Sequence, residues 1–224
     1  MKPPLYIAFH QGLGDAIICC GLIRKLAQSN DWIVVPSKWV NLRSVEEIFS
    51  DLKNVTVMGV DSDQESRKWV ERFVRGGSQV LKLGIFRDEP LRSDWDRQFY
   101  DQAGVDFEER WRGFKVPMDC SLDRIHKLDN PEFFHDDPDR GFVIDSKRTG
   151  CGRLGGSLPI TPSIWSYLER VQFAKEIHVI DSCFLCMADS VPTKAKKLVL
   201  HQYAMAEAKP MGPPTLRKNW TILT

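Results

Sequence analysis

Residues 5–18 read LYIAFHQGLGDAII, in which an apolar run passes through a polar turn with two glycines into a second apolar run. A short apolar run bounded by turn residues is typical of a buried strand, so we predict a strand over 5–9. Apolar side chains then recur at helical spacing from residue 16 to residue 28, which predicts a helix. A strand that leads through a glycine turn into a helix is the first unit of a parallel α/β sheet.

The same alternation of strand and helix continues along the first part of the chain. Apolar runs predict strands over 31–36, 55–60 and 79–86, and amphipathic patterns predict helices over 44–52 and 64–74. Ser44 and Glu47 have the spacing of a capping box, which indicates a helix start at Ser44. Near-continuous apolar strands joined by helices indicate a parallel sheet with the first strand at its centre. We therefore expect residues 1–88 to form a Rossmann-like lobe.

A second series of strands and helices follows a segment of mixed aromatic and charged residues. Its predicted strands cover 132–135, 141–145, 176–181, 198–203 and 220–223. A helix is predicted to start at Thr161, with Pro162 at its first position. The predicted fold class is therefore α/β, with two small Rossmann-like lobes at residues 1–88 and 131–224. Residues 89–130 are expected to connect the lobes as a hinge region.

Charge and composition exclude several classes of protein. Lysine and arginine number 31 and aspartate and glutamate 30, so a net charge of +1 offers no overall footprint for nucleic acid or an anionic membrane. No apolar run approaches the roughly 18 residues that a transmembrane helix requires, and the first residues lack the layout of a signal peptide. The six cysteines are spread thinly, which is typical of free thiols in a reducing compartment. We expect a cytoplasmic globular protein with no nucleic-acid partner and no transmembrane segment.

The turn after the first strand is the strongest candidate for a binding loop. It consists of His10, Gln11, Gly12, Leu13, Gly14 and Asp15. Its glycines allow a ligand to approach the backbone, and the helix N-terminus that follows offers N–H groups to an anion or a hydroxyl group. The same residues also fit a simple turn in which Asp15 caps the helix, so both interpretations stay open. The turn is not a dinucleotide fingerprint, because Ile17 replaces the third glycine, and it lacks the Lys-Ser/Thr of a phosphate loop.

A second candidate site lies at the end of the 176–181 strand, where Asp181, Ser182 and Cys183 lead into a short helix. Residues at the carboxyl end of a parallel strand, beside a helix N-terminus, are well placed to contact a ligand. A helix cap explains the same residues equally well. Arg140 lies in an acidic turn before the 141–145 strand, and its planar guanidinium matches the oxygens of a diphosphate.

Two patterns of metal-ligating residues are interpreted as structural. Asp137 and Asp139 have an Asp-x-Asp spacing, but the same spacing occurs twice elsewhere in the chain, so we expect no metal site. Cys183 and Cys186 have the spacing of a zinc or redox pair. Because no second pair accompanies them, we interpret both as core thiols.

Residues 150–155 spell Gly-x-Gly-x-x-Gly after a predicted strand, which is the pattern of a dinucleotide site. Pro159 and Pro162 displace the helix that such a site requires at its third glycine. The match is therefore incomplete. An NAD(P)-dependent oxidoreductase that uses this loop remains an alternative to the functions considered for the first two candidate sites.

The two candidate sites together resemble the motifs of a known family. Residues 5–26, with Gly12-Leu13-Gly14-Asp15 before an apolar helix, resemble the N-terminal motif of the heptosyltransferase-like glycosyltransferases. Residues 176–191 resemble the strand-loop-helix of their C-terminal lobe. The resemblance implies the GT-B architecture, in which two Rossmann-like lobes face each other across a cleft. It also implies transfer of a sugar from a nucleotide-sugar donor to the hydroxyl of a glycan or glycoconjugate acceptor.

The resemblance implies roles for individual residues. Asp15 would be the base that acts on the acceptor hydroxyl, and Asp181 and Ser182 would hold the donor diphosphate. Apart from the resemblance, Arg140 and the helix dipole could take the role of a cation, so we expect neither a metal nor another cofactor. The chain departs from the family at Cys186, where the family has histidine, at Cys183, where glycine is frequent, and in its shorter length. The shorter length and Cys186 favour the alternative of a catalytically inactive accessory protein that binds a nucleotide or a sugar.

Overall fold

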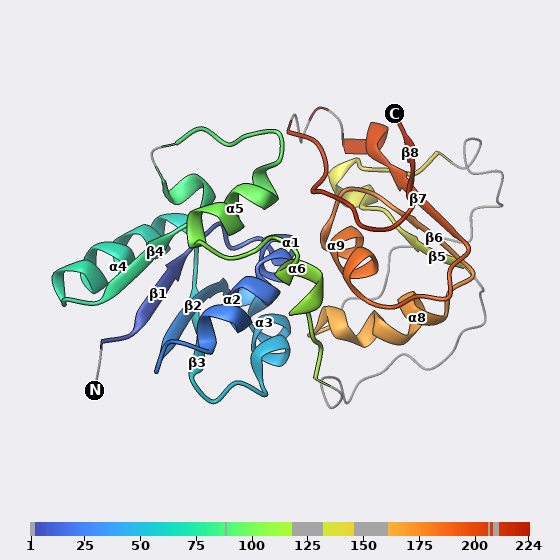
Figure 1. Cartoon of the computed structure of the whole chain (residues 1–224). Helices are drawn as coiled ribbons and strands as arrows, with labels where there is room; N and C mark the ends of the chain where they lie inside the picture. The colour runs from blue at the N-terminus through green and yellow to red at the C-terminus, as the bar shows by residue number, and fades with distance from the viewer. Residues whose placement is uncertain (1–2, 88, 118–131, 146–160, 206, 208–210) are drawn as a thin grey trace. The chain divides into compact units, whose positions relative to one another are not determined.

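The computed structural model describes residues 3–87, 89–117, 132–145, 161–205, 207 and 211–224 (Figure 1). The chain divides into two compact units, Met1–Leu122 and Asp123–Thr224. Each unit contains a four-stranded parallel sheet together with helices. The predicted α/β class is therefore confirmed, and the two sheets are compatible with two Rossmann-like lobes.

The sheet of the first unit has the order β3-β2-β1-β4, and its strands are all parallel. The strands are β1 (Leu5–Ala8), β2 (Ile33–Lys38), β3 (Val55–Val60) and β4 (Gln79–Lys82). β1 lies inside the sheet and is fully buried, as its continuous apolar sequence predicted. Successive strands extend the sheet on one side as far as β3, and β4 then pairs with β1 on the other side. The loop after β1 therefore lies at the switch point where such sheets bind ligands.

The first unit also contains six helices and two 3₁₀ turns within the described residues. They are α1 (Leu13–Ile18), α2 (Cys20–Ala27), η1 (Trp39–Asn41), α3 (Leu42–Phe49), α4 (Asp63–Arg75), η2 (Gly84–Phe86), α5 (Trp95–Ala103) and α6 (Glu109–Arg112). α4 covers one face of the sheet, where the ring of Phe73 stacks on Tyr6 of β1 with centroids 4.6 Å apart. This packing fixes the start of α4 near the end of β1.

The predicted helix over 16–28 is divided into two helices, because the side chain of Tyr100 interrupts it. α1 ends at Ile18 and α2 begins at Cys20. The Tyr100 hydroxyl donates a hydrogen bond to the Ile18 carbonyl (2.7 Å) and accepts one from the Leu22 N–H (3.2 Å). In a continuous helix these two backbone groups would bond to each other. The hydroxyl therefore replaces one helical hydrogen bond and breaks the helix at this point.

The predicted capping box of Ser44 and Glu47 is wrong. α3 begins at Leu42, directly after η1, so Ser44 lies inside the helix and is buried. Glu47 forms an ion pair with Arg43, at 3.2 Å from its Nε, instead of capping the helix start. The 3₁₀ turn that follows β2 already supplies the first turn, so the helix starts before the capping signal.

The fourth predicted strand, over 79–86, is too long. β4 ends at Lys82, and the chain turns into η2. Gly84 has a φ of +56°, a left-handed conformation that glycine adopts readily and other residues avoid. The ring of Phe99 also occupies the space beside this glycine, where a Cβ would lie 2.5 Å from the ring. The turn at Gly84 therefore ends the strand.

Residues 89–117, which were predicted to be part of a hinge region, belong to the first unit. Within it α6 packs against α2. The closest approach is at Gly21 of α2, where a Cβ would lie 1.8 Å from the carbonyl oxygen of Glu109. The division between the units falls after Leu122, inside the connecting region that was predicted over residues 89–130.

Gly21→Ala is expected to lower the free energy of unfolding of the first unit by about 1–3 kcal/mol, because the new methyl group overlaps the α6 backbone. Urea unfolding followed by circular dichroism measures the loss. Gly76→Ala is the matched control, since a Cβ at Gly76 would have its nearest neighbour 3.4 Å away. Equal losses in the two variants would contradict the role assigned to the close contact at Gly21.

The sheet of the second unit has the order β5-β6-β7-β8 and is also parallel. Its strands are β5 (Glu132–His135), β6 (Glu176–Val179), β7 (Lys197–His201) and β8 (Thr221–Leu223). Its helical elements are η3 (Pro138–Arg140), η4 (Ile164–Tyr167), α8 (Leu168–Phe173), α9 (Cys183–Ser190) and η5 (Gln202–Met205). No helix among the described residues of either unit is long and apolar enough to cross a membrane.

Two predictions about the second unit are wrong. Residues 141–145 do not form a strand, because Phe142 folds back and exchanges backbone hydrogen bonds with Asp137 of 2.8 and 2.9 Å. Thr161 is not a helix cap. Ser163 has that role, since its hydroxyl accepts a hydrogen bond from the Trp165 N–H (3.2 Å) at the start of η4. In both places a local turn uses the backbone groups that the predicted element needs.

Candidate functional site

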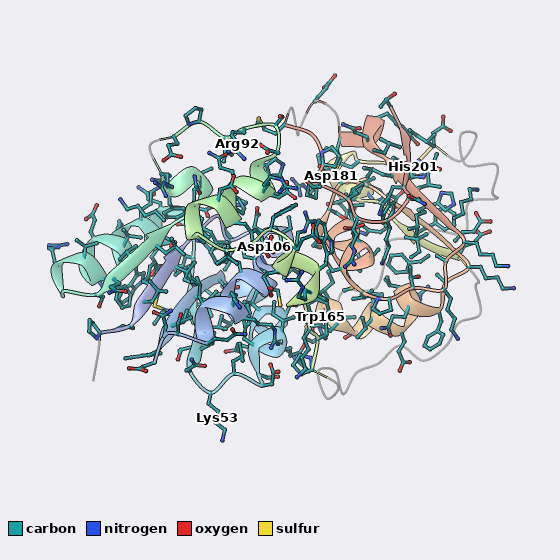
Figure 2. The ribbon with its side chains drawn as sticks, in the orientation of Figure 1. Lys53, Arg92, Asp106, Trp165, Asp181 and His201 are labelled. Carbon is teal, nitrogen blue, oxygen red and sulfur yellow. The ribbon has the colours of Figure 1, made fainter. Side chains whose placement is uncertain are left out.

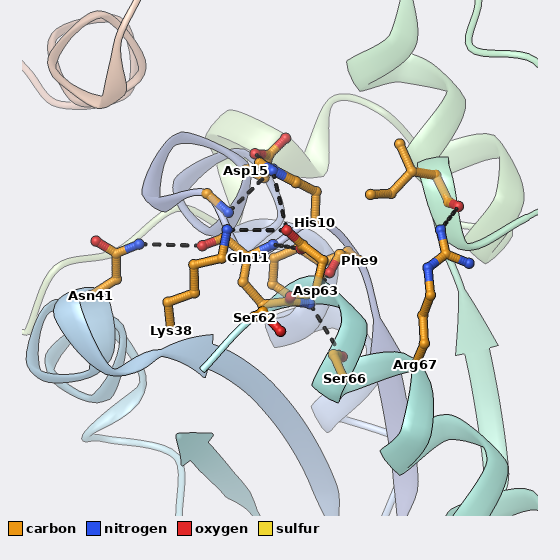
Figure 3. Close-up of polar contacts among 12 residues, drawn as sticks. Phe9, His10, Gln11, Asp15, Lys38, Asn41, Ser62, Asp63, Ser66 and Arg67 are labelled. Carbon is orange, nitrogen blue, oxygen red and sulfur yellow. Dashed lines mark hydrogen bonds and ion pairs between the residues drawn. The ribbon is translucent and has the colours of Figure 1, made fainter. Parts of the chain in front are cut away.

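The turn after β1 carries a hydrogen-bonded pair of side chains, His10 and Asp15 (Figure 3). The Nδ1 atom of His10 lies 2.9 Å from Oδ2 of Asp15. His10 follows β1 and Asp15 lies in the first turn of α1, so the pair closes the turn at Gly12. A Cβ at Gly12 would lie 2.5 Å from the same Asp15 oxygen, so a glycine is required there for the two side chains to meet.

Asp15 is not the cap of α1. Gly12 occupies the N-cap position, and within the described residues no side chain caps this helix. Leu13 and Gly14 are its first two residues. Of the two interpretations that the sequence left open for Asp15, helix capping is therefore wrong, and the carboxylate is held by His10 instead.

Asp63 and Lys38 extend this pair into an array of alternating charges. Oδ2 of Asp63 lies 3.0 Å from Nζ of Lys38 and 3.7 Å from Nε2 of His10. Lys38 is the last residue of β2, and Asp63 begins α4 shortly after β3. The carboxyl ends of three adjacent strands therefore supply the array, and His10 lies between two carboxylates.

The backbone of the turn is held in place by Gln11. Its N–H donates a hydrogen bond to Oδ1 of Asp63 (3.1 Å), and its carbonyl accepts one from Nδ2 of Asn41 (3.2 Å). Its side chain is buried, and the amide nitrogen donates to the Phe9 carbonyl and to Oγ of Ser66. The turn that carries His10 is therefore tied to β1, to η1 and to α4 at once.

The imidazole is the most accessible of the three acid–base side chains. The side chain of His10 is 44% exposed, against 18% for Asp15 and 27% for Asp63. The hydrogen bond to Asp15 raises the pKa of His10 above its ordinary value, although burial opposes the shift. Burial alone would raise the pKa of Asp63, but hydrogen bonds from Gln11 and Lys38 outweigh it and lower that pKa.

In the second unit Asp181 is buried at the end of β6, and Ser182 follows it (Figure 2). The hydroxyl of Ser182 accepts a hydrogen bond from the N–H of Phe184 (3.3 Å) and so caps α9. Cys183 is the first residue of that helix and is partly exposed, whereas Cys186 is buried. Neither cysteine forms a disulfide within the described residues. Cys186 lies in the core as predicted, whereas Cys183, also predicted to be a core thiol, is partly exposed because it begins α9.

Arg140 lies in η3, which follows β5 at the same edge of the second sheet as Asp181. Its side chain is 69% exposed and lies 3.9 Å from Oδ2 of Asp137. The guanidinium also stacks over Phe142, 5.1 Å from the ring centroid. These contacts hold Arg140 to its own turn. The Gly-x-Gly-x-x-Gly pattern at 150–155 lies outside the described residues.

Comparison with family models, curated proteins and solved structures found no match to this chain. Among the described residues, no group of three or more histidine, cysteine, aspartate or glutamate side chains is arranged to hold a metal ion.

The sequence did not single out Lys38, Asn41 or Asp63 as site residues. Asp63 belongs to one of the two other Asp-x-Asp pairs, Asp61 and Asp63. A signal was present, because Lys38 and Asp63 follow the predicted strands 31–36 and 55–60, and the carboxyl ends of parallel strands share one edge of a sheet. The missing information was the strand order, which places both strands on the same side of β1.

The array is suited to proton transfer. A carboxylate can only accept a hydrogen bond, so the 2.9 Å contact with Asp15 assigns the ring hydrogen to Nδ1 of His10, in preference to the longer 3.3 Å contact in which Nδ1 would accept from the Gly12 N–H. The lone pair of Nε2 is then the one able to accept a proton from a substrate. A carboxylate that orients an imidazole in this way also stabilises the imidazolium that forms. The second carboxylate, Asp63, adds to this stabilisation at 3.7 Å.

Proposed function

We propose that this chain is a glycosyltransferase that moves a sugar from a nucleotide-diphosphate donor to an acceptor hydroxyl of a glycan or glycoconjugate. The observation that carries the proposal is the 2.9 Å contact between His10 and Asp15. It lies at the carboxyl edge of a parallel sheet, in the loop at the switch point, where ligands of such sheets bind. The two units would then be the two lobes of a GT-B-like enzyme.

In the proposed reaction the acceptor oxygen attacks the anomeric carbon of the donor sugar. The bond from that carbon to the diphosphate oxygen breaks, and its electron pair leaves with the diphosphate. The hydroxyl proton passes to the His10–Asp15 pair, with Nε2 of His10 as the accepting atom. Asp15, the base implied by the family resemblance, thus acts through His10, and the imidazolium forms between Asp15 and Asp63.

The donor diphosphate is proposed to bind at the start of α9. A helix N-terminus favours an anion through its partial positive charge and its N–H groups. Asp181, Ser182 and Cys183 lie at this terminus, and Arg140 adds a cation on the neighbouring turn. The backbone N–H groups that follow Asp181 and Ser182, together with the Arg140 guanidinium, would stabilise the leaving diphosphate without a metal or another cofactor.

Asp15→Asn is expected to lower kcat by about 10²–10⁴-fold, the range that general base catalysis contributes. The assay is release of nucleoside diphosphate from a panel of nucleotide sugars, with glycan acceptors. The reacting imidazole must be neutral, so wild-type kcat/KM should fall as the pH drops through the raised pKa of His10. Removal of the Asp15 charge lowers that pKa, so the acid limb should move to lower pH in the variant.

Glu71→Gln is the matched control, because it also neutralises a carboxylate of the first unit, on an exposed part of α4 away from the array. Its kcat and its pH profile should equal those of the wild type. An Asp15→Asn variant that keeps wild-type kcat and the same acid limb would contradict the proposed reaction.

The second candidate function is binding of a nucleotide or sugar without turnover. The observation that favours it is Cys186, which is 4% exposed in α9 at the position where the family has histidine. A buried thiol does not present a polar contact to a donor. Stoichiometric binding of a nucleotide sugar by calorimetry, with no diphosphate release across the acceptor panel, would support this function over the first.

A further inference from the structure

Trp39 is an exposed aromatic residue close to the array in the first unit. It lies in η1, directly after Lys38 at the end of β2. Trp39 is 61% exposed, although tryptophan is among the side chains that folding buries most. A large apolar side chain that stays exposed at the ligand-binding edge of a parallel sheet is therefore a candidate ligand contact.

The ring of Trp39 packs against Gly59 of β3. A Cβ at Gly59 would lie 2.5 Å from Cη2 and Cζ3 of Trp39 and 2.7 Å from Cε3. These three neighbouring atoms are almost equally far from one point, so the six-membered ring lies with a face over the strand. Glycine inside a strand weakens it, but here it leaves room for this close approach. With one face on β3, the ring has its other face open to solvent.

The residues that flank Trp39 connect it to the array. Lys38 binds Asp63 at 3.0 Å, and Nδ2 of Asn41 donates a hydrogen bond to the Gln11 carbonyl at 3.2 Å. Trp39 directly follows Lys38 and lies two residues before Asn41, so its backbone is fixed on both sides by residues that contact the array. The side chains of Lys38 and Asp63 are each about one-third exposed, at 30% and 27%.

We propose that Trp39 is the stacking platform for a pyranose ring of the acceptor, with Lys38 and Asp63 as partners for its hydroxyl groups. The inference rests on the proposed function and adds that the acceptor is a saccharide bound by its ring. A pyranose has a face of C–H groups that packs on an aromatic ring and a rim of hydroxyls that bind charged and amide groups. An open indole face beside a lysine and an aspartate matches both parts of this chemistry.

Binding is tested without turnover, by saturation-transfer NMR on the full chain. The probes are the methyl glycosides of glucose, galactose, mannose and N-acetylglucosamine, with sorbitol as the open-chain control. At least one glycoside should bind through the protons of one ring face. Trp39→Ala should weaken that binding about tenfold or more, and Gly59→Ala should weaken it as well, because the new Cβ displaces the ring.

Trp32→Ala is the matched control. Trp32 is 46% exposed and precedes β2 at the amino edge of the sheet, where its Nε1 donates to Oγ1 of Thr56 (3.1 Å). Its removal should leave glycoside binding unchanged. Circular dichroism of each variant establishes that a loss of binding is not a loss of fold.

Three results would overturn the inference. The first is that wild type and Trp39→Ala bind glycosides equally well. The second is Trp39-dependent binding of uridine or adenosine monophosphate in place of glycosides, and the third is a dimer in sedimentation that Trp39→Ala abolishes. Trp39-dependent glycoside binding by a chain that transfers no sugar would support the platform and contradict only the transferase. Sugar transfer with the same acceptor KM in wild type and Trp39→Ala would contradict only the platform.

Discussion

Asp96→Asn is expected to lower the free energy of unfolding of the first unit by about 3–5 kcal/mol, because it leaves a buried guanidinium without its counter-charge. Arg110 is fully buried, and the side chain of Asp96 is 1% exposed. Nη1 of Arg110 donates a hydrogen bond to Oδ2 of Asp96. Among the described residues, Nε and Nη2 of Arg110 have no hydrogen-bond partner. The carboxylate is therefore the main compensation for the buried charge.

The surroundings of Arg110 show why the charge cannot move to water. Its guanidinium lies 4.9 Å from the ring centroid of Trp111 and 5.9 Å from that of Phe107. These rings belong to the same segment as α6, which packs on α2 through Gly21. Exposure of Arg110 would therefore open the contact between α6 and α2.

Hydrogen exchange of peptides from α2 and α5 measures this loss in the full chain and separates it from the second unit. The double variant Asp96→Leu/Arg110→Met removes both charges and should recover most of the stability, since apolar replacement of a whole buried pair is often neutral. Glu71→Gln breaks an exposed i,i+4 contact with Arg75 and should cost about 0.5 kcal/mol or less. If Asp96→Asn were as mild as Glu71→Gln, the charge of Arg110 would need another source of compensation.

The strands were the most predictable part of the fold. β1 is wholly apolar and fully buried, and β2 begins with the buried run Ile33-Val34-Val35, so in these strands the property that the sequence shows is the one that folding uses. β6 is also largely buried, although it contains Glu176 and His178. The ends of elements were less predictable, because partners far along the chain decide them. Tyr100 breaks the helix after Ile18 from 82 positions away, and no pattern within residues 16–28 contains that information.

The candidate site was predictable to the same extent. His10 and Asp15 lie in one short turn, so their contact follows from local sequence once the strand and the helix are known. Lys38 and Asp63 join them only because the sheet order brings β2 and β3 to the same side of β1. For Asp181 and Ser182 the sequence left capping and ligand contact open, and the structure establishes capping by Ser182.

A buried pair of histidines makes the second unit sensitive to acid. His178 of β6 and His201 of β7 are both fully buried, and Nδ1 of His178 lies 3.1 Å from Nε2 of His201 (Figure 2 labels His201). Nε2 of His178 lies 3.4 Å from Glu176, and Nδ1 of His201 lies 3.2 Å from the Tyr203 hydroxyl. One arrangement of protons satisfies all of these hydrogen bonds. In it Tyr203 donates to His201, His201 donates to His178, and His178 donates to Glu176. Each imidazole is then neutral.

Protonation of either histidine disrupts this series of hydrogen bonds. The pKa of His201 is lowered to about 4, mainly by burial, with His178 and Lys197 contributing in the same direction. Burial also lowers the pKa of His178, although Glu176 and Glu132 act in the opposite direction. A second proton on His178 would place two N–H groups against each other at the 3.1 Å contact. The folded unit therefore excludes the protons that an unfolded chain would bind.

The free energy of unfolding of the second unit is expected to fall as the pH drops from about 6.5, the ordinary pKa of histidine, towards 4. In this window the unfolded chain binds more protons than the folded one, so acid favours unfolding. Each such histidine contributes a slope of up to about 1.4 kcal/mol per pH unit. His201→Gln should remove one of these contributions, while His135, whose pKa burial also lowers to about 4, keeps part of the slope.

Hydrogen exchange of β6 and β7 peptides between pH 7 and 5, corrected for the intrinsic rate, measures the slope. His10→Gln is the control, because the pKa of His10 is raised in the folded state. The contribution of His10 to the free energy of unfolding is complete at low pH and is lost as the pH rises through that pKa. Removal of His10 therefore cannot relieve a loss of stability that occurs in acid. A second unit with the same protection at pH 7 and pH 5, or the same slope in His201→Gln, would mean that the pair accepts protons without strain. The 3.1 Å distance between the two ring nitrogens has room for one hydrogen and not two, which argues against that outcome.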